Sequence, residues 1–281
     1  MKSRWGTAMA VTEGITRPAA GPQTAPPVRP GPGRSRAARL RELVIEVVLI
    51  ASMMVIYQGI RHLADGQLGV AFRHADWVWE VERALRLPSE AAIQHWALSW
   101  GGTARLANLY YVGVHFPGTI AAMVWLWIRH RPDYLRMRTE MALLTGAALF
   151  VHVIFPLAPP RLVSSFGMVD TMILTGPSAY PDNSTDGVAN QFAAMPSLHV
   201  GWALLVAIAV IRVGTSRWRW LALAHPALTV SVVVITANHY WLDGIVAGLL
   251  LVGAIRLLAL RTRYPGRLPG QPLPSFSRVL L

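Results

Sequence analysis

The chain has 281 residues, of which 53% are hydrophobic and 14% charged, and its mean hydropathy is +0.40. Soluble domains carry about 25% charged residues, so this composition excludes a disordered chain and argues against a water-soluble globule. The absence of cysteine excludes disulfides, thiolate metal sites and cysteine nucleophiles.

The expected elements begin with a tail. Residues 1–42 are rich in Pro, Gly, Ala and Arg and lack an early apolar run, so we expect a disordered, basic cytoplasmic tail rather than a signal peptide. A membrane-embedded domain over residues 43–260 and a second cytoplasmic tail over 261–281 follow. The fold class expected is all-α, a polytopic membrane helix bundle with about six transmembrane helices. Their apolar segments are residues 43–63, 106–128, 141–156, 197–213, 221–237 and 244–260.

The basic residues predict how this bundle is oriented. Segments on the side of the N-terminus (1–42, 129–138, 212–219 and 256–281) hold 20 of the 26 Lys and Arg residues, and the other side holds six. Cytoplasmic loops are enriched in these residues, so both termini of this multi-pass protein are expected in the cytoplasm, with the bundle in the cell membrane. The formal charge of +12 is then a topology signal, and no nucleic-acid partner is expected.

The segment 64–104, expected outside, is interpreted as interfacial helices. Tryptophan favours the headgroup zone of a bilayer, and Ser89 is a capping residue for a second short helix. One or two helices on the outer leaflet are therefore expected, either as a packing element over the bundle or with a role in lipid entry. The tryptophans of this segment are Trp77, Trp79, Trp96 and Trp100.

Three short segments, 155–161, 194–199 and 236–243, carry ionisable residues at the outer ends of the expected helices. Such residues at a membrane edge are costly and indicate function. The orientation was derived without their histidines and carboxylates, yet it places all three on one side, so we expect a single site. Their polar residues are Arg161 in the first, Ser197 and His199 in the second, and His239 and Asp243 in the third.

These residue types suit phosphoryl transfer without a metal or cofactor. The Arg161 guanidinium and the first N–H groups of a helix starting after Ser197 can bind a phosphate. If helical, Asp243 shares a face with His239 and can orient it, so that one histidine attacks phosphorus while His199 protonates the leaving oxygen. Considered alone, each residue also fits a role outside phosphoryl transfer. These roles are an interfacial contact, a helix cap, a buried structural hydrogen bond and half of a metal site.

Two motifs, Pro196-Ser197-x-His199 and His239-x-x-x-Asp243, resemble the second and third motifs of the type-2 phosphatidic acid phosphatase superfamily. The resemblance covers about residues 43–260, and the stretch 108–116 is also similar to bacterial members. More narrowly, three stretches resemble the inositolphosphotransferase (inositol phosphorylceramide synthase-like) branch: Ala158-Pro159-Pro160-Arg161, Met195-Pro196-Ser197-Leu198-His199 and Asn238-His239-Tyr240-x-x-Asp243.

The resemblance implies a role for each of these residues. His239 is the implied nucleophile, which forms a phosphohistidine, Asp243 orients it, and His199 protonates the leaving group. Ser197 and Arg161 are implied to hold the phosphate oxygens. The implied substrate is a lipid phosphate or phospholipid, and the acceptor is either water, as in a lipid phosphatase, or a hydroxyl of another lipid or polyol, as in a phosphotransferase.

Two positions depart from the superfamily pattern. The lysine usual seven residues before the first-motif arginine is Ile154, and Val232 and Val233 stand where a Ser-Arg pair is usual. Two customary phosphate-binding cations are therefore missing, and we expect Arg105, His115 or another group to contribute. His115 is interpreted either as a substrate-binding residue for the headgroup or phosphate, or as a buried histidine bonded to a backbone carbonyl.

Two other classes of function stay open. One is a non-enzymatic membrane transporter with a polar histidine and carboxylate site, and the other is a metal-dependent intramembrane hydrolase. The ionisable residues cluster at one rim, which favours the enzyme over the transporter. The sequence leaves the lipid, the acceptor and the oligomeric state undetermined.

Overall fold

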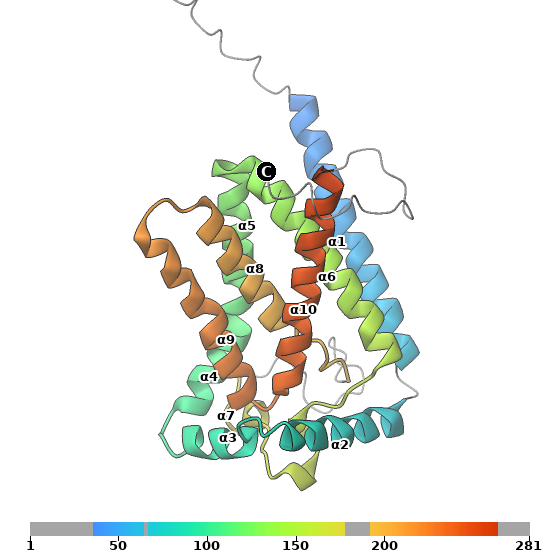
Figure 1. Ribbon diagram of the computed structural model, residues 1–281, viewed down its shortest axis with the longest axis vertical. Coiled ribbons are helices and arrows are strands. Elements are labelled where there is room, and N and C mark those ends of the chain that lie inside the picture. Colours follow the sequence, from blue (N-terminus) through green and yellow to red (C-terminus); the bar gives the residue numbers. More distant parts are fainter. Residues whose placement is uncertain (1–35, 65–66, 178–191, 264–281) are drawn as a thin grey trace, which may run out of the picture. The chain divides into compact units, whose positions relative to one another are not determined.

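The computed structural model describes residues 36–64, 67–177 and 192–263 (Figure 1). The chain divides into two units after Val48, and the site described below lies within the second. Helix α1 (Arg36–Ala64) begins before residue 43, the expected start of the first membrane segment. Most of the two expected tails lies outside the described residues.

The second unit contains the helices that the second to sixth apolar segments predicted. Four helical stretches, Thr103–Arg129, Arg131–Ile154, Arg217–Ile235 and Trp241–Arg261, are long and apolar enough to cross a membrane, whereas Leu198–Val213 is shorter. The expected all-α membrane bundle is therefore confirmed. Its elements are α4 (Thr103–Gly113), α5 (His115–Arg129), α6 (Arg131–Ile154), α8 (Leu198–Val213), the 3-10 helix η3 (Arg217–Leu223), α9 (Ala224–Ile235) and α10 (Trp241–Arg263).

The segment expected as one helix over 106–128 is divided at Val114 into α4 and α5. Pro117 explains the division. It lacks the N–H that would bond to the carbonyl of Gly113, and its ring clashes with that carbonyl in a continuous helix. The helix hydrogen bonds resume with Gly118 N–H, which donates to Val114 O at 2.8 Å. His115 therefore occupies the first position of α5.

Helix α6 begins well before the apolar segment that predicted it. Its first turns hold charged residues expected to form a loop over 129–138, and that expectation was wrong. The buried carboxylate of Glu140 accepts hydrogen bonds from Arg136 Nε at 3.1 Å and from Arg212 Nη1 of α8 at 2.7 and 3.0 Å. A buried carboxylate is retained when it is paired, so this ion cluster keeps the charged turns helical.

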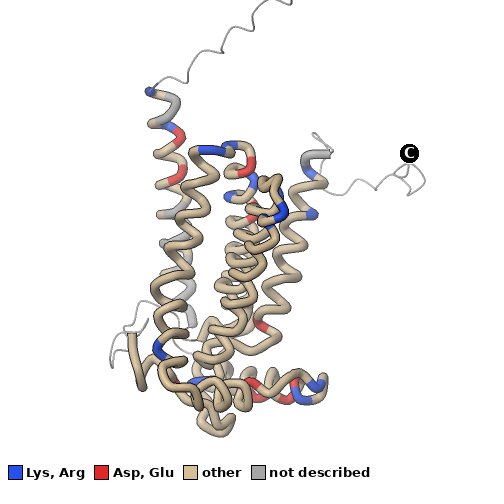
Figure 2. The backbone as a smooth tube through the Cα atoms, turned by 90° about the vertical axis from the view of Figure 1, so that its left-hand side faces the viewer, with Lys and Arg blue, Asp and Glu red and all other residues tan. Residues whose placement is uncertain are grey.

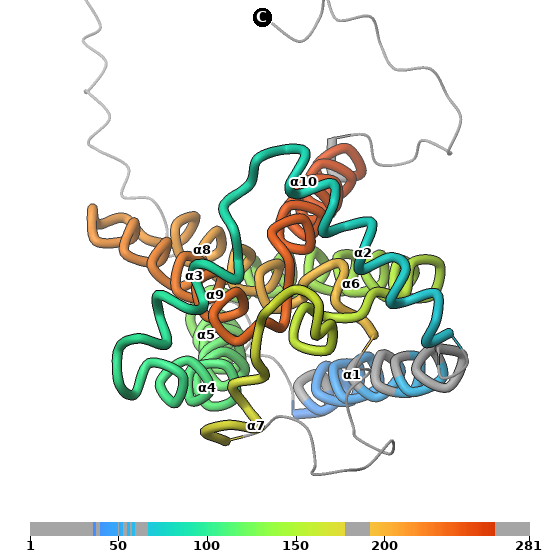
Figure 3. The backbone as a smooth tube through the Cα atoms, turned by 90° about the horizontal axis from the view of Figure 1, so that it is seen from below, coloured from blue at the N-terminus to red at the C-terminus, as the bar shows by residue number. Residues whose placement is uncertain are grey.

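Three further helices lie across one end of the bundle, which Figure 3 views directly. The first two correspond to the helices expected in segment 64–104, and Ser89 caps the second by accepting a hydrogen bond from Ala92 N–H at 3.3 Å, as predicted. Trp77 on α2, Trp96 on α3 and Trp100, two residues after α3, are exposed. The three are α2 (Leu68–Ala84), α3 (Glu90–Leu98) and α7 (Thr171–Thr175).

Two buried amides fasten these outer elements to the bundle. Gln94 of α3 donates to Val169 O at 2.9 Å and to Ile235 O, at the end of α9, at 2.8 Å. Asn108 of α4 donates to Thr171 O and accepts from the hydroxyl of Thr171, both at 2.8 Å. An unpaired buried amide destabilises the folded protein, so these bonds favour the position of the loop after α6 over the bundle end.

The charged residues of the bundle are distributed unevenly (Figure 2). Arginines at the junctions of α5 with α6 and of α8 with η3, and in the last turns of α10, lie at the end remote from α2 and α3. Acidic and basic residues mix on α2 at the other end. The assignment of the arginine-rich end to the cytoplasm stays a prediction from the charge pattern.

Candidate active site

Two of the three polar segments pair through their backbones. Leu157 and Ala193 form an isolated parallel β-bridge. The N–H of Leu157 donates to Phe192 O at 2.7 Å, and the N–H of Ala194 donates to Leu157 O at 3.3 Å. The chain that leaves α6 thus runs beside the chain that enters α8, although more than 30 residues separate them.

The third polar segment joins both of the others. The hydroxyl of Tyr240 donates to Ala158 O at 2.9 Å, which connects the third segment to the first. The N–H of Ser197 donates to the backbone carbonyl of Asp243 at 3.0 Å, which connects the second to the third. The structure therefore brings all three segments together at the bundle end covered by α2 and α3.

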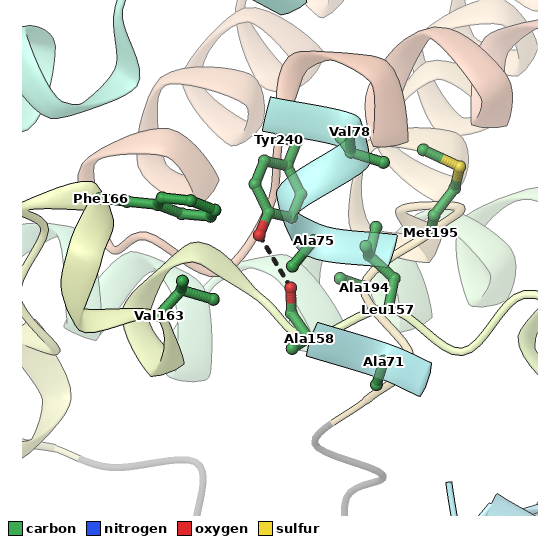
Figure 4. Packing of buried hydrophobic residues seen from close by; sticks show 10 residues of the cluster. All are labelled: Ala71, Ala75, Val78, Leu157, Ala158, Val163, Phe166, Ala194, Met195 and Tyr240. Atoms are coloured by element: carbon green, nitrogen blue, oxygen red, sulfur yellow. Dashed lines mark hydrogen bonds between the residues drawn. The ribbon is translucent and has the colours of Figure 1, made fainter. Parts of the chain in front are cut away.

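Helix α2 packs an apolar face against this junction (Figure 4). Its small residues allow close approach to the backbones of the polar segments, and Ala158 N–H donates to Ala71 O at 3.2 Å. Burial of this cluster holds α2 over the site. The cluster consists of Ala71, Ala75, Val78, Leu157, Ala158, Val163, Phe166, Ala194, Met195 and Tyr240.

His239 is oriented by two oxygens at one nitrogen. Its Nδ1 lies 2.8 Å from the carbonyl oxygen of Ala194 and 3.2 Å from Oδ2 of Asp243. A carbonyl oxygen can only accept, so Nδ1 carries the proton, and in the neutral ring the lone pair is on Nε2. The same Asp243 oxygen accepts from Tyr240 N–H at 2.9 Å, as the acidic residue of a capping box does at a helix start.

Arg161 is fixed on several sides. Its backbone N–H donates to Ala237 O at 3.0 Å, and its Nε donates to Asn238 Oδ1 at 3.1 Å and lies 3.5 Å from Oδ2 of Asp170. The side chain is 1% exposed. Because Asn238 directly precedes His239, one short segment positions both the guanidinium and the imidazole.

The N-terminus of α8 adds hydrogen-bond donors. Ser197 is the N-cap: its Oγ accepts from Val200 N–H at 3.3 Å, and a hydroxyl also has one hydrogen that it can donate. The first N–H groups of a helix have no acceptor within it and favour an anion. His199 follows in this first turn, with its ring centroid 5.8 Å from that of His239, so both rings can contact one phosphoryl group.

Aromatic rings surround His199. The ring of Tyr111 stacks on it with centroids 4.2 Å apart, and Phe116 presents an edge at 5.4 Å. The ring of Tyr111 therefore covers one face of the His199 imidazole. His115 lies at 4.8 Å on α5.

A family model described as the PAP2 superfamily matches residues 76–258, which is more than half of the chain and includes all three polar segments. The chain belongs to the PAP2 superfamily. Comparison with curated proteins gave no match, and comparison with solved structures gave none. PAP2 membership supports a phosphatase- or phosphotransferase-type function on a lipid phosphate in a membrane protein.

The positions that depart from the PAP2 pattern hold apolar residues, so they supply no cation to the site. Ile154 is 60% exposed at the end of α6, and Val232 and Val233 are buried in an apolar cluster with Tyr111. Arg105, one of the expected substitutes, is exposed on α4, whereas His115 is buried beside His199. Within the described ranges, no three His, Asp or Glu side chains are grouped to hold a metal ion.

Several contributors to this candidate site were not predicted from the sequence. The carbonyl of Ala194 orients His239, the carboxylate of Asp170 pairs with Arg161, and the ring of Tyr111 stacks on His199. Tyr111 could have been found from the sequence, because it lies in the stretch 108–116 that resembles bacterial members of the superfamily. Backbone carbonyls carry no sequence signal, and Asp170 was one of several acids in the loop after α6.

A pair of buried carboxyl groups fixes the start of α10. Glu82 Oε1 accepts from Leu242 N–H at 2.8 Å, and Glu90 Oε2 lies 2.6 Å from Nη2 of Arg83. Both carboxyl groups are fully buried. Burial, together with a hydrogen bond to Glu90, raises the pKa of Glu82 to about 9. Glu82 is therefore protonated at neutral pH, and its hydrogen bond to Glu90 ties α2 to α3. The bond from Leu242 N–H ties α2 to the residue before Asp243.

The variant Glu82→Gln tests this protonation. Because the pKa of Glu82 is higher in the folded than in the unfolded protein, the folded state binds the extra proton, and stability decreases as pH rises from about 4.5 to about 9. Glutamine keeps an acceptor for Leu242 and a donor for Glu90 but does not ionise. In detergent, we expect the variant to melt at a higher temperature than the wild type near pH 9, by about 2–4 °C for each kcal/mol, and at the same temperature below pH 5. If the wild type instead melts at a higher temperature than the variant, by a margin that grows with pH, Glu82 is not protonated in the folded protein.

Proposed function

We propose that the protein transfers the phosphoryl or phospho-alcohol group of a lipid to a hydroxyl through a phosphohistidine on Nε2 of His239. One observation carries the proposal. Nδ1 of His239 is held by Ala194 O and Asp243 Oδ2, so the lone pair of the ring is on Nε2. The ring centroid of His199 lies 5.8 Å from that of His239, and Arg161 donates to the residue before His239, Asn238. A histidine held in this way by a carboxylate is a stronger nucleophile, because the carboxylate stabilises the positive charge that attack creates on the ring.

In the first half-reaction, Nε2 of His239 forms a bond to phosphorus and the bond from phosphorus to the leaving oxygen breaks. The leaving oxygen takes a proton from His199. Arg161, the hydroxyl of Ser197 and the first N–H groups of α8 bind the phosphoryl oxygens, where negative charge must be stabilised. Asp243 stabilises the imidazolium character of the phosphorylated ring. These roles use only groups of this chain.

In the second half-reaction, a hydroxyl attacks the phosphohistidine and His199, now neutral, accepts its proton. Water as the acceptor makes the protein a lipid phosphatase, and an alcohol makes it a phosphotransferase. The resemblance of stretches 158–161, 195–199 and 238–243 to the inositolphosphotransferase branch favours an alcohol. We therefore propose the phosphotransferase as the first candidate and the phosphatase as the second.

The reaction is proposed to occur at the outer face of the cell membrane, with both termini in the cytoplasm. The polar segments lie at the bundle end remote from the arginine-rich junctions, and Lys and Arg favour the cytoplasmic side. Exposed tryptophans on α2 and α3 suit the headgroup zone at the same end, where a lipid phosphate is located. A lipid can then present its phosphate to the site without leaving the bilayer.

Labelling of the protein tests this function. Purified protein in detergent is incubated with radiolabelled phosphatidic acid or radiolabelled phosphatidylinositol, with and without a chelator, and quenched in alkali. We expect label on His239 that is stable to alkali and lost in acid, and that forms equally in chelator. The release of inorganic phosphate identifies water as the acceptor, and a new phosphodiester identifies an alcohol. Turnover of either lipid without labelled histidine, or turnover that depends on added metal, overturns the proposal.

A further inference from the structure

Four histidines form a row that extends from the candidate site into the bundle. The ring centroids of His239 and His199 are 5.8 Å apart, those of His199 and His115 are 4.8 Å apart, and those of His115 and His225 are 5.8 Å apart. The four come from the segment before α10, from α8, from α5 and from α9. The proposed mechanism uses only the first two, which leaves His115 and His225 unexplained.

His115 is buried without a hydrogen bond. Its side chain is among the largest that are fully buried, and neither of its ring nitrogens has a partner within the part of the chain that the structure describes. The interpretation of His115 as a histidine bonded to a backbone carbonyl is therefore wrong for these residues. An unpaired buried polar group costs about 1–3 kcal/mol, so an imidazole in this place points to a polar group that binds to it.

His225 closes the far end of the row. Its Nδ1 is 2.8 Å from the hydroxyl of Tyr110, which also lies 3.1 Å from Oγ1 of Thr229. Its Nε2, like both nitrogens of His115, has no partner within the described ranges. The bond to Tyr110 fixes the His225 ring against His115, so the two imidazoles are held in a defined arrangement between α4, α5 and α9.

The surroundings of His115 suit a hydroxyl rather than a phosphate. Besides the two imidazoles, its neighbours are the rings of Phe116 at 5.3 Å and Trp202 at 6.4 Å, which carry no charge. A phosphate is an anion that only accepts hydrogen bonds, and Arg161 with the N-terminus of α8 already matches it. A neutral imidazole offers one donor and one acceptor, and a hydroxyl both accepts and donates.

We propose that His115 donates a hydrogen bond to the hydroxyl oxygen that is exchanged at phosphorus. This role rests on the function proposed above. In the second half-reaction that oxygen bonds to phosphorus, the bond from phosphorus to Nε2 of His239 breaks with its electron pair returning to the nitrogen, and the hydroxyl proton passes to His199. One lone pair of the oxygen attacks phosphorus, and the other accepts from the N–H of His115. The leaving oxygen occupies the same place in the first half-reaction.

The test separates the two half-reactions. Radiolabelled p-nitrophenyl phosphate is the donor, because p-nitrophenolate leaves without a proton and makes the first half-reaction independent of a donor at the leaving oxygen. The burst of p-nitrophenolate measures formation of the phosphohistidine and counts the folded sites. Loss of label from the protein is then followed in water and in glycerol, with inorganic phosphate and glycerol phosphate as the respective products.

For His115→Phe we expect a burst at the wild-type rate, followed by loss of label that is about 10²–10³-fold slower, the scale measured when one hydrogen-bond donor is removed from an active site. His115→Gln keeps an N–H donor and is expected to lose label at a rate closer to the wild type. His130→Phe, which removes an imidazole from the remote end of α5, is the matched control and should behave as the wild type. If His115→Phe loses label more slowly than the wild type in water only, His115 binds water as the acceptor. If it is slower in transfer to glycerol, His115 binds an alcohol.

Three results overturn the proposal. If His115→Phe slows the burst and the loss of label equally, or slows neither, His115 is a packing residue and the proposed function is unaffected. The same conclusion follows if His115→Gln is as slow as His115→Phe. If the wild type forms no labelled histidine from this donor or from the labelled lipids, the proposed function fails, and the role of His115 fails with it.

Discussion

The variant His239→Gln is expected to lose about six orders of magnitude in turnover, the scale measured when a catalytic nucleophile is removed from an enzyme. Glutamine has no nucleophilic nitrogen, so no phosphorylated intermediate forms. Its amide can still donate to Ala194 O and Asp243, the two oxygens that hold Nδ1 in the wild type. The variant should therefore fold as the wild type, and the measurement is product release together with trapping of labelled protein.

The matched control for this variant is His130→Gln. His130 lies at the turn between α5 and α6, at the opposite end of the bundle from the polar segments, and is expected to be replaceable without loss of turnover. Size-exclusion profiles in detergent and thermal melting report whether both variants fold. Turnover by folded His239→Gln at more than a thousandth of the wild-type rate, with label still on the protein, contradicts a nucleophilic His239.

Hydropathy predicted the bundle because a membrane helix needs only an apolar run of sufficient length. All six expected segments coincide with helices, and the errors concern their ends. Pro117 interrupts the second segment, and the ion cluster around Glu140 keeps charged turns of α6 helical. The first effect was visible in the sequence. The second depends on Arg212, a residue more than 70 positions away, which no local pattern reveals.

The candidate site shows the same division between local and distant effects. Ionisable side chains within membrane segments are rare and costly, so Arg161, His199, His239 and Asp243, which adjoin the apolar segments, could be selected from sequence alone. Their arrangement depends on contacts between distant segments, such as the bridge of Leu157 with Ala193. The spacing of His239 and Asp243 indicated a shared helix face if both residues were helical. The structure instead places His239 before α10, and the aspartate reaches it from the first turn.

Buried partners were the hardest to predict. Glu82 lies in a helix that the sequence identifies as interfacial, where a carboxylate is ordinarily solvated. The structure buries it against the start of α10, where it accepts from Leu242 N–H. The sequence predicted neither this contact nor the row of imidazoles through His115 and His225. Each of these interactions joins helices whose neighbours are decided by packing of the whole bundle.

The variant Asp243→Asn is expected to lower turnover by about 10³–10⁴-fold, the scale seen when the carboxylate that orients a catalytic histidine becomes an amide. The amide oxygen can still accept from Tyr240 N–H, so α10 keeps its start. If the amide N–H₂ faces Nδ1 of His239, it favours a proton on Nε2 and removes the lone pair that attacks phosphorus. The amide also lacks the negative charge that stabilises the phosphorylated ring.

The loss is expected to be smaller than for His239→Gln, because Ala194 O still accepts from Nδ1 and keeps part of the population in the reactive tautomer. Single-turnover labelling should show slow formation of phosphohistidine with an unchanged number of sites at completion. Asp133→Asn, in the first turn of α6 at the remote end, makes the same chemical change and should leave turnover intact. A loss below tenfold in Asp243→Asn means that the Ala194 carbonyl alone orients the ring, and that the carboxylate serves mainly as the cap of α10.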